Sequence, residues 1–131
     1  SPVLSVLLRD GLRRATQHKE LQEALGGRLS FSESDSLITL QTIQSHDVVY
    51  LDPMFPPKRK KSALPQKSAQ LLQYIIGCSN KEETKKLFEL SLRTATKRVV
   101  VKRPNHAKAF GDNPTVVHKG KLVRYEVYKP V

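Results

Sequence analysis

The sequence has one cysteine, no tryptophan and no long apolar run, and each of these shortages narrows the class of protein. Since Cys78 is the only cysteine, no internal disulfide can form, which fits a reducing compartment. No base stands near Cys78 in the sequence, so we interpret it as a packed thiol at a helix end. No segment approaches the roughly 20 apolar residues of a membrane span, and no signal peptide is recognisable. We therefore expect a cytoplasmic protein without a membrane partner.

Acidic residues are also scarce, with 12 Asp and Glu against 23 Lys and Arg, which gives a net charge of +11. Such an excess favours a polyanionic partner, because cations that neutralise phosphates release counterions from nucleic acid. The alternative is a basic surface that serves solubility, and composition leaves both interpretations open. A chain of 131 residues is long enough for one compact unit with a modest core.

The first half of the sequence shows helical periodicity followed by strand patterns. Ser1 and Pro2 suit the start of a helix, and apolar residues then recur at helical spacing as far as Leu12. A second helical stripe over 21–25 ends at Gly26 and Gly27, after which we expect a short strand over 28–32 and a polar segment over 33–36. The apolar run over 47–51 is typical of a strand that is buried on both faces of a parallel sheet.

The second half begins with residues 52–66, which hold four prolines and a basic cluster and therefore predict a long loop. Helical spacing returns over 71–76, and Ser79 with Glu82 predicts a capping box at the start of a further helix. A second buried strand is expected over 97–103, and an antiparallel hairpin over 115–128, in which Val123, Tyr125 and Val127 alternate. The fold class predicted by this order is α/β, an open sheet with an antiparallel edge.

In open α/β sheets, ligands bind beyond the carboxyl ends of the strands, where the loops converge. Three predicted loops qualify, at 33–36, 52–57 and 102–106. The sharpest is the middle one, in which Asp52 and Pro53 follow a buried strand and Phe55 comes shortly after. A carboxylate and a proline carbonyl can both accept hydrogen bonds from an amino group, while an aromatic ring can stack on the base that carries it. The alternative is a strand-ending turn in which Asp52 caps neighbouring amides and Phe55 packs in the core.

Two blocks of the sequence resemble a known family. The run VVYLDPMFP (48–56) is similar to the amino-methyltransferase signature, in which Asp, Asn or Ser is followed by Pro, a variable residue and an aromatic. Together with KKSAL (60–64) and ATKRVVVKRP (95–104), it resembles the ribosomal RNA small subunit methyltransferase J family. The likeness runs from Pro2 to Val131 and is weak between Pro65 and Leu92. It implies a Rossmann-like class I methyltransferase sheet, S-adenosylmethionine as cofactor, and methylation of the exocyclic N2 of a guanosine in 16S ribosomal RNA.

The resemblance also implies roles for particular residues. Asp52, Pro53 and Phe55 would hold the base, and the cofactor would contact Ser34, Asp35 and Asp52. The alternative for Ser34 and Asp35 is a helix N-cap before residue 37. Family members carry a strand, a glycine-rich loop and a ribose-binding acid that have no counterpart here, so we expect residues 1–131 to be the carboxyl-terminal part of a single methyltransferase domain, lacking the first strands and inactive alone.

Basic residues fall on the predicted ligand edge in two groups, where phosphate contacts would position RNA without reading its sequence. The alternative is a solvated basic face. The expected RNA-binding residues are Lys58, Arg59, Lys60, Lys61, Lys102 and Arg103. No metal is predicted, because His18, His46, His106 and His118 lack the spacing of metal ligands. The expected partner is 16S ribosomal RNA or the small ribosomal subunit. Two other functions stay open, an adenine or cytosine amino methyltransferase acting on DNA and a non-catalytic RNA-binding module.

Overall fold

The computed structural model describes residues 2–53, 67, 70–71 and 80–131. They belong to two compact units, one formed by residues 1–34 and 65–77 and the other by 35–64 and 78–131. Each unit is described separately. The predictions for Cys78, for Phe55, for the basic run 58–61 and for most of the helix at 71–76 lie outside the described residues.

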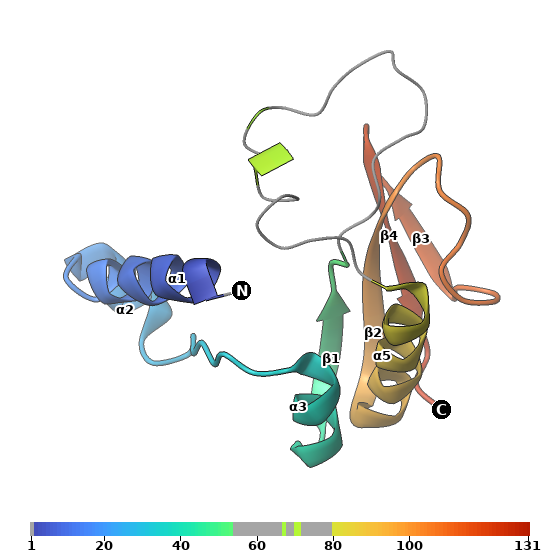
Figure 1. Ribbon diagram of the computed structural model, residues 1–131, viewed down its shortest axis with the longest axis horizontal. Coiled ribbons are helices and arrows are strands. Elements are labelled where there is room, and N and C mark those ends of the chain that lie inside the picture. The colour runs from blue at the N-terminus through green and yellow to red at the C-terminus, as the bar shows by residue number, and fades with distance from the viewer. Residues whose placement is uncertain (1, 54–66, 68–69, 72–79) are drawn as a thin grey trace. The chain divides into compact units, whose positions relative to one another are not determined.

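In the first unit the structure describes the helices α1 (Pro2–Ala15) and α2 (Lys19–Leu25), as the periodicity predicted (Figure 1). Helix α2 ends at Gly26, whose φ of 42° is left-handed and whose N–H donates to the Gln22 carbonyl. The strand predicted over 28–32 is wrong, because these residues form no strand. Arg28 turns back on the helix instead, with its N–H 2.6 Å from the Leu25 oxygen and its side chain donating to the Ala24 carbonyl.

The described residues of the second unit form a four-stranded sheet with two helices, and this arrangement confirms the α/β class. Its strands are β1 (His46–Leu51), β2 (Ala95–Pro104), β3 (Val116–Lys119) and β4 (Val123–Tyr128). Their order is β1-β2-β4-β3, in which β1 runs parallel to β2 while β4 pairs antiparallel with both of its neighbours (Figure 1). The expected antiparallel hairpin is therefore confirmed.

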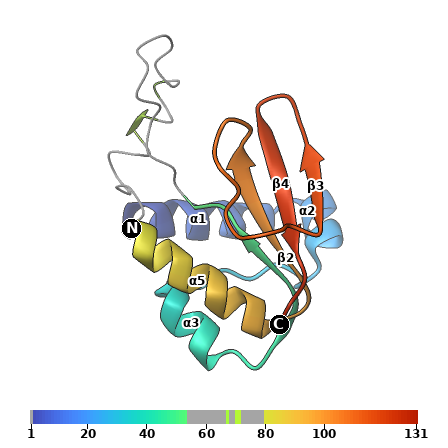
Figure 2. The same ribbon diagram turned by 90° about the vertical axis from the view of Figure 1, so that its right-hand side faces the viewer.

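Helices α3 (Ser36–Thr42) and α5 (Lys81–Thr94) pack together, and α5 lies against β1 and β2 (Figure 2). The Thr94 hydroxyl joins the two helices by donating to the Leu40 carbonyl at 3.3 Å. The cap of α5 differs from the prediction, since Asn80 is the N-cap and its side chain accepts from the Glu82 N–H at 3.1 Å. Asparagine stands one residue closer to the first helical turn than the predicted Ser79, and its amide oxygen is an equally good cap.

The core lies between α5 and the sheet. It consists of Leu51, Phe88, Ala95, Val99, Val101 and Tyr128. The Phe88 ring meets Phe110 and Tyr128 edge to face, at centroid distances of 5.1 and 4.8 Å. The expectation that β1 is buried on both faces is wrong for this structure, because Val48 is 46% and Tyr50 52% exposed. Both side chains alternate with buried Leu51 and so lie on the face of the sheet that α5 does not cover.

The buried face of β4 is polar, which the sequence did not predict. Arg124, Glu126 and Tyr128 point toward the core side, whereas the alternating Val123 and Val127 are half-buried on the other face. Glu126 is only 1% and Arg124 8% exposed, and their ion pair is 2.7 Å long. This burial requires partners, because unpaired buried charges are very costly.

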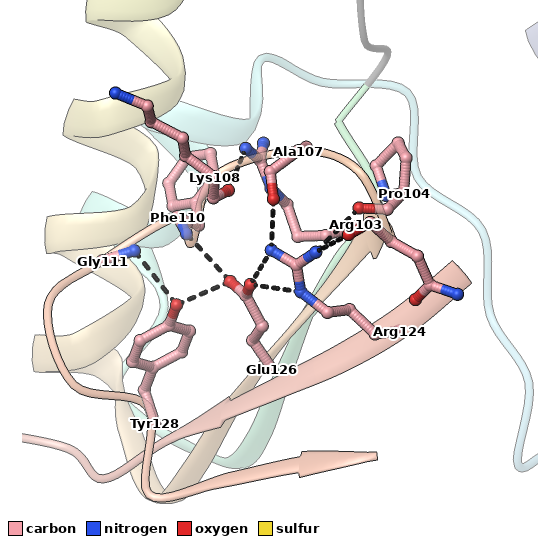
Figure 3. A network of polar contacts seen from close by, with 10 residues as sticks. Arg103, Pro104, Ala107, Lys108, Phe110, Gly111, Arg124, Glu126 and Tyr128 are labelled. Carbon is pink, nitrogen blue, oxygen red and sulfur yellow. Dashed lines mark hydrogen bonds and ion pairs between the residues drawn. The ribbon is translucent and has the colours of Figure 1, made fainter. Parts of the chain in front are cut away.

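The partners come from the loop that follows β2 (Figure 3). The Glu126 carboxylate accepts from the Phe110 N–H at 2.9 Å and from the Tyr128 hydroxyl at 2.7 Å, and that hydroxyl accepts from the Gly111 N–H at 3.0 Å. The Arg124 guanidinium donates to three loop carbonyls, those of Pro104, Asn105 and Ala107. The network therefore fastens residues 104–111 to the end of the sheet.

The network also sets two pKa values. Burial raises the pKa of Glu126, but hydrogen bonds from Phe110, Tyr128 and Arg124 outweigh it, so the pKa lies below its ordinary 4.5. Burial, with the carboxylate of Glu126 beside it, raises the pKa of the Tyr128 phenol to about 12. Glu126 is therefore ionised and Tyr128 protonated at neutral pH, as the hydrogen bonds require.

Candidate active site at the carboxyl edge of the sheet

Asp52 directly follows β1, and its carboxylate lies beside the end of β2. The parallel pairing aligns Leu51 with Val101, so Asp52, which follows the end of β1, lies beside Lys102, which is still within β2. Lys102 Nζ donates to Asp52 Oδ2 at 2.8 Å. The structure thus brings together two residues that the sequence placed in separate loops of one edge, as the geometry of a parallel sheet predicted.

The pair lies on the face of the sheet that α5 leaves open, next to two tyrosines. Tyr50 lies on β1, two positions before Asp52. Tyr125 lies on β4, where it pairs with Lys102 of β2. The side chain of Lys102 is 34% and that of Asp52 46% exposed, so a ligand can reach both. The hydrogen bond to Asp52 raises the pKa of Lys102, while burial and the Asp52 charge raise the pKa of Tyr50. A carboxylate, an ammonium group and two phenols therefore share this part of the edge.

The interpretation of Asp52 as a turn cap stays a prediction, because the amides that follow Pro53 lie outside the described residues. Within the described part of the chain, its carboxylate accepts a hydrogen bond from the ammonium group of Lys102. Pro53 itself is half-buried. Its carbonyl follows the carboxylate by one residue, as the amino-methyltransferase signature requires.

Ser34 and Asp35, the two predicted cofactor contacts, are consecutive residues at the boundary between the two units. Ser34 is the last residue of one unit and Asp35 the first of the other. Asp35 is the N-cap of α3, where its Oδ1 accepts from the Leu37 N–H at 2.8 Å. The helix N-cap that was the alternative interpretation of this segment is thus formed by Asp35. A cap uses one carboxylate oxygen, so Asp35 can still accept a hydrogen bond from a ligand through the other.

Lys102 and Arg103, predicted as one basic group, point to opposite faces of β2, because side chains alternate along a strand. The Arg103 guanidinium donates to the Lys108 carbonyl at 2.7 Å and lies 5.1 Å from the centroid of the Phe110 ring. Burial lowers the pKa of Arg103 from its ordinary value. The Arg103 side chain thus contributes to holding the loop after β2, and its role in RNA binding stays a prediction.

The edge carries further basic residues that the sequence did not single out. Asn105 joins the loop after β2 to the turn between β3 and β4, because its side chain donates to the carbonyls of Gly120 and Lys121 at 2.9 and 3.3 Å. Since β4 begins opposite the end of β2, this turn lies at the same edge as Asp52. The exposed lysines collected there, called the basic rim, are Lys108, Lys119 and Lys121. The common location of these lysines follows from the register in which the strands pair, and a single sequence does not reveal that register.

A hollow of about 270 Å³ lies in the first unit, between α1, α2 and the segment after them. Leu12, Leu25, Gly26 and Phe31 are among the residues that line it, and none of the predicted site residues does. Among the described residues, no group of three or more His, Cys, Asp and Glu is placed to hold a metal ion. The helices of the described ranges include none with the length and apolar character needed to cross a membrane.

Comparisons with known proteins agree with this fold. Residues 1–130 match the family model described as "Putative SAM-dependent methyltransferase". Ribosomal RNA small subunit methyltransferase J of Coxiella burnetii (strain RSA 331 / Henzerling II) is 42% identical over 130 residues, which cover 98% of this chain and 49% of that protein. The protein of the same name from Buchnera aphidicola subsp. Acyrthosiphon pisum (strain APS) is 39% identical over 131 residues, covering 98% and 52%.

A solved structure is similar as well. The crystal structure of a SAM-dependent methyltransferase from Neisseria gonorrhoeae superposes with a TM-score of 0.71 at 29% identity, over 99% of this chain and 52% of that one. The fold is thus that of a SAM-dependent methyltransferase. The chain belongs to the family of SAM-dependent methyltransferases that the matching model describes. It spans about half the length of the curated relatives it matches.

Proposed function

We propose that residues 1–131 form the carboxyl-terminal part of a single methyltransferase domain, and that this domain methylates the exocyclic N2 of a guanosine in 16S ribosomal RNA. The observation that carries the proposal is Asp52-Pro53 at the carboxyl end of β1, on an accessible edge of the sheet. The names of the relatives support ribosomal RNA as the substrate over DNA, and the charge of +11 suits either nucleic acid.

The chemistry asks the protein to improve a poor nucleophile. The lone pair of a guanine amino group is delocalised into the ring, so the nitrogen must be oriented and made more pyramidal. The Asp52 carboxylate and the Pro53 carbonyl each accept one N–H, which aligns the nitrogen to displace the methyl group from the sulfonium in line. The Asp52 carboxylate takes up the proton that the nitrogen releases. S-adenosylmethionine, when bound, supplies an electrophilic methyl group on a sulfonium. Phe55, on the resemblance, stacks on the base after the nucleotide has turned out of its helix.

The residues present fit part of the cofactor. Adenine offers an exocyclic amino group, and the second carboxylate oxygen of Asp35, which the cap does not use, is a suitable acceptor at the start of α3. Ser34 would add a hydroxyl beside it. The sequence contains neither a glycine-rich nucleotide loop nor the family's ribose-binding acid, so these 131 residues supply only some of the contacts. We therefore expect little cofactor affinity from them alone.

The RNA would lie along the carboxyl edge of the sheet. Lys58, Arg59, Lys60 and Lys61 follow the Asp52-Pro53 turn in the sequence, and the basic rim continues the same edge across β2 and β4. Phosphate contacts from both groups would fix the register of the RNA, while the Asp52 site selects the base.

The test uses the full-length protein with isotopically labelled S-adenosylmethionine and either 16S ribosomal RNA or small ribosomal subunits. We expect label in N2-methylguanosine after digestion to nucleosides, and a rate of labelling that is lower by about a hundredfold or more with the Asp52→Ala variant. Label in DNA adenine or cytosine would favour the DNA alternative. RNA binding without label in any substrate would favour a non-catalytic module. Calorimetry on the 131 residues alone should detect no micromolar cofactor binding.

A further inference from the structure

An ion pair at the carboxyl edge of the sheet joins Asp52, the proposed catalytic residue, to Lys102, for which the sequence predicted only an RNA contact. Lys102 Nζ is 2.8 Å from Asp52 Oδ2, a normal length for a charge-assisted hydrogen bond. Both residues stand one position past the aligned pair Leu51 and Val101, so the sheet itself fixes the distance between their backbones. A phosphate-binding lysine needs only a flexible, exposed tip, whereas this one is directed at a neighbouring side chain and is 34% exposed.

The contact leaves the two carboxylate oxygens in different states. Oδ2 is occupied by the ammonium group, whereas Oδ1 has no partner among the described residues. The Asp52 side chain is 46% exposed, and without Lys102 its carboxylate could rotate freely toward water. With Lys102 in place, one oxygen is anchored and the other is held ready to accept an N–H from a base.

We propose that Lys102 is a positioning residue for methyl transfer, which holds the Asp52 carboxylate in one orientation so that Oδ1 meets the amino group of the target base. The inference rests on the proposed function. Lys102 acts through Asp52 and contributes no separate proton transfer. Its effect belongs to the chemical step, because misplacing a reacting group by about 1 Å can cost a hundredfold in rate.

The same two strands carry a matched control. At their amino-terminal ends, Lys97 Nζ donates to Asp47 Oδ2, also at 2.8 Å, and the Thr96 hydroxyl donates to the other oxygen at 3.1 Å. The two pairs thus share their chemistry, strands and length, but only one lies at the proposed site. Removing Lys97 reproduces the loss of a β1–β2 ion pair without touching Asp52.

The experiment measures single-turnover methyl transfer by the full-length protein, at saturating RNA and cofactor, for Lys102→Met, Lys102→Arg and Lys97→Met. We expect Lys102→Met to lower the rate about 10- to 100-fold, Lys102→Arg to recover a large part of it, and Lys97→Met to leave it unchanged. In an Asp52→Asn background, Lys102→Met should cost nothing further, because a residue that acts through Asp52 has no other target. Thermal melting of each variant checks the fold.

RNA affinity as a function of salt separates positioning from phosphate binding. A positioning lysine leaves the slope of log affinity against log salt unchanged, whereas a lost phosphate contact lowers it by about 0.7 to 0.9. The inference is overturned if Lys102→Met transfers the methyl group at the wild-type rate. It is also overturned if Lys102→Met lowers the rate by the same factor in the Asp52→Asn background as in the wild type. If Lys102→Met does not fold, Lys102→Arg decides, since a folded arginine variant with no residual activity also overturns it. Absence of methyl transfer by the wild type would instead refute the proposed function.

Discussion

Glu126 offers the strongest test of how the edge is built, because replacing it with glutamine removes one charge and keeps the size of the side chain. The glutamine loses the ion pair with Arg124 and presents an NH₂ group where the carboxylate now accepts from several donors. Removing one partner of a buried ion pair costs about 3 to 5 kcal/mol. Because glutamine retains one acceptor oxygen, we expect Glu126→Gln to lower the free energy of unfolding by about 3 kcal/mol.

The pH dependence follows from the direction of the pKa shift. The pKa of Glu126 is lower in the folded protein than its ordinary 4.5, so ionisation stabilises the fold above that value. This contribution is lost as the pH falls below 4.5 and through the folded pKa. The difference in stability between wild type and Glu126→Gln should therefore be largest near neutral pH and shrink in acid.

Urea unfolding of the full-length protein at several pH values measures this difference, and amide exchange at Phe110 and Gly111 reports on the loop. Asp47→Asn is the control, because its ion pair with Lys97 is exposed and such pairs contribute little to stability. A Glu126→Gln protein as stable as Asp47→Asn, or a difference that does not shrink in acid, would refute the assignment of the buried network.

Three further predictions concern neighbouring parts of the second unit. Gly111→Ala should lower stability by about 1 to 3 kcal/mol in thermal or urea unfolding, because its Cβ would lie 2.8 Å from the Phe88 ring; wild-type stability would show that the ring can shift freely. Replacing the basic rim, Lys108, Lys119 and Lys121, with alanine should reduce the slope of log RNA affinity against log salt by about 2 to 3. Alanine at Arg93, Arg98 and Lys129, the control, should leave this slope unchanged. If both triple variants have the same slope, the basic rim is only a solvated surface. Asp52→Ala should lower single-turnover methyl transfer about a hundredfold or more with RNA binding nearly intact, and a collapsed melting temperature would favour the structural turn instead.

The sequence predicted the parts of the fold that depend on local pattern. Continuous apolar runs identified β1 and β2, alternation identified the β3–β4 hairpin, and the turn residues Asp52 and Pro53 marked the end of β1. Residues 28–32 misled because their short apolar pattern resembles a strand, yet a strand requires a neighbour to complete its hydrogen bonds, and the described chain provides none there.

Other features could not be predicted because they depend on pairing between distant segments. The alternation of β4 suggested an apolar face, but the side that meets α5 and the loop carries Arg124 and Glu126, whose burial is possible only with the Phe110 N–H and the loop carbonyls in place. A rule that places charged residues outside therefore fails where the backbone of a loop supplies the partners.

The end of β2 connects the buried polar network with the proposed site. Consecutive residues of a strand point to opposite faces, so Lys102 reaches Asp52 on the open face while Arg103 holds the Lys108 carbonyl on the covered face. A displacement of this strand end would move both Lys102, which contacts the Asp52 carboxylate, and the loop that Arg103 holds. The buried network of Arg124 and Glu126 prevents such a displacement, because it ties the carbonyls that follow Arg103 to β4. The polar core thus stabilises the position from which Lys102 orients Asp52, and this explains why charge is buried beneath the proposed site.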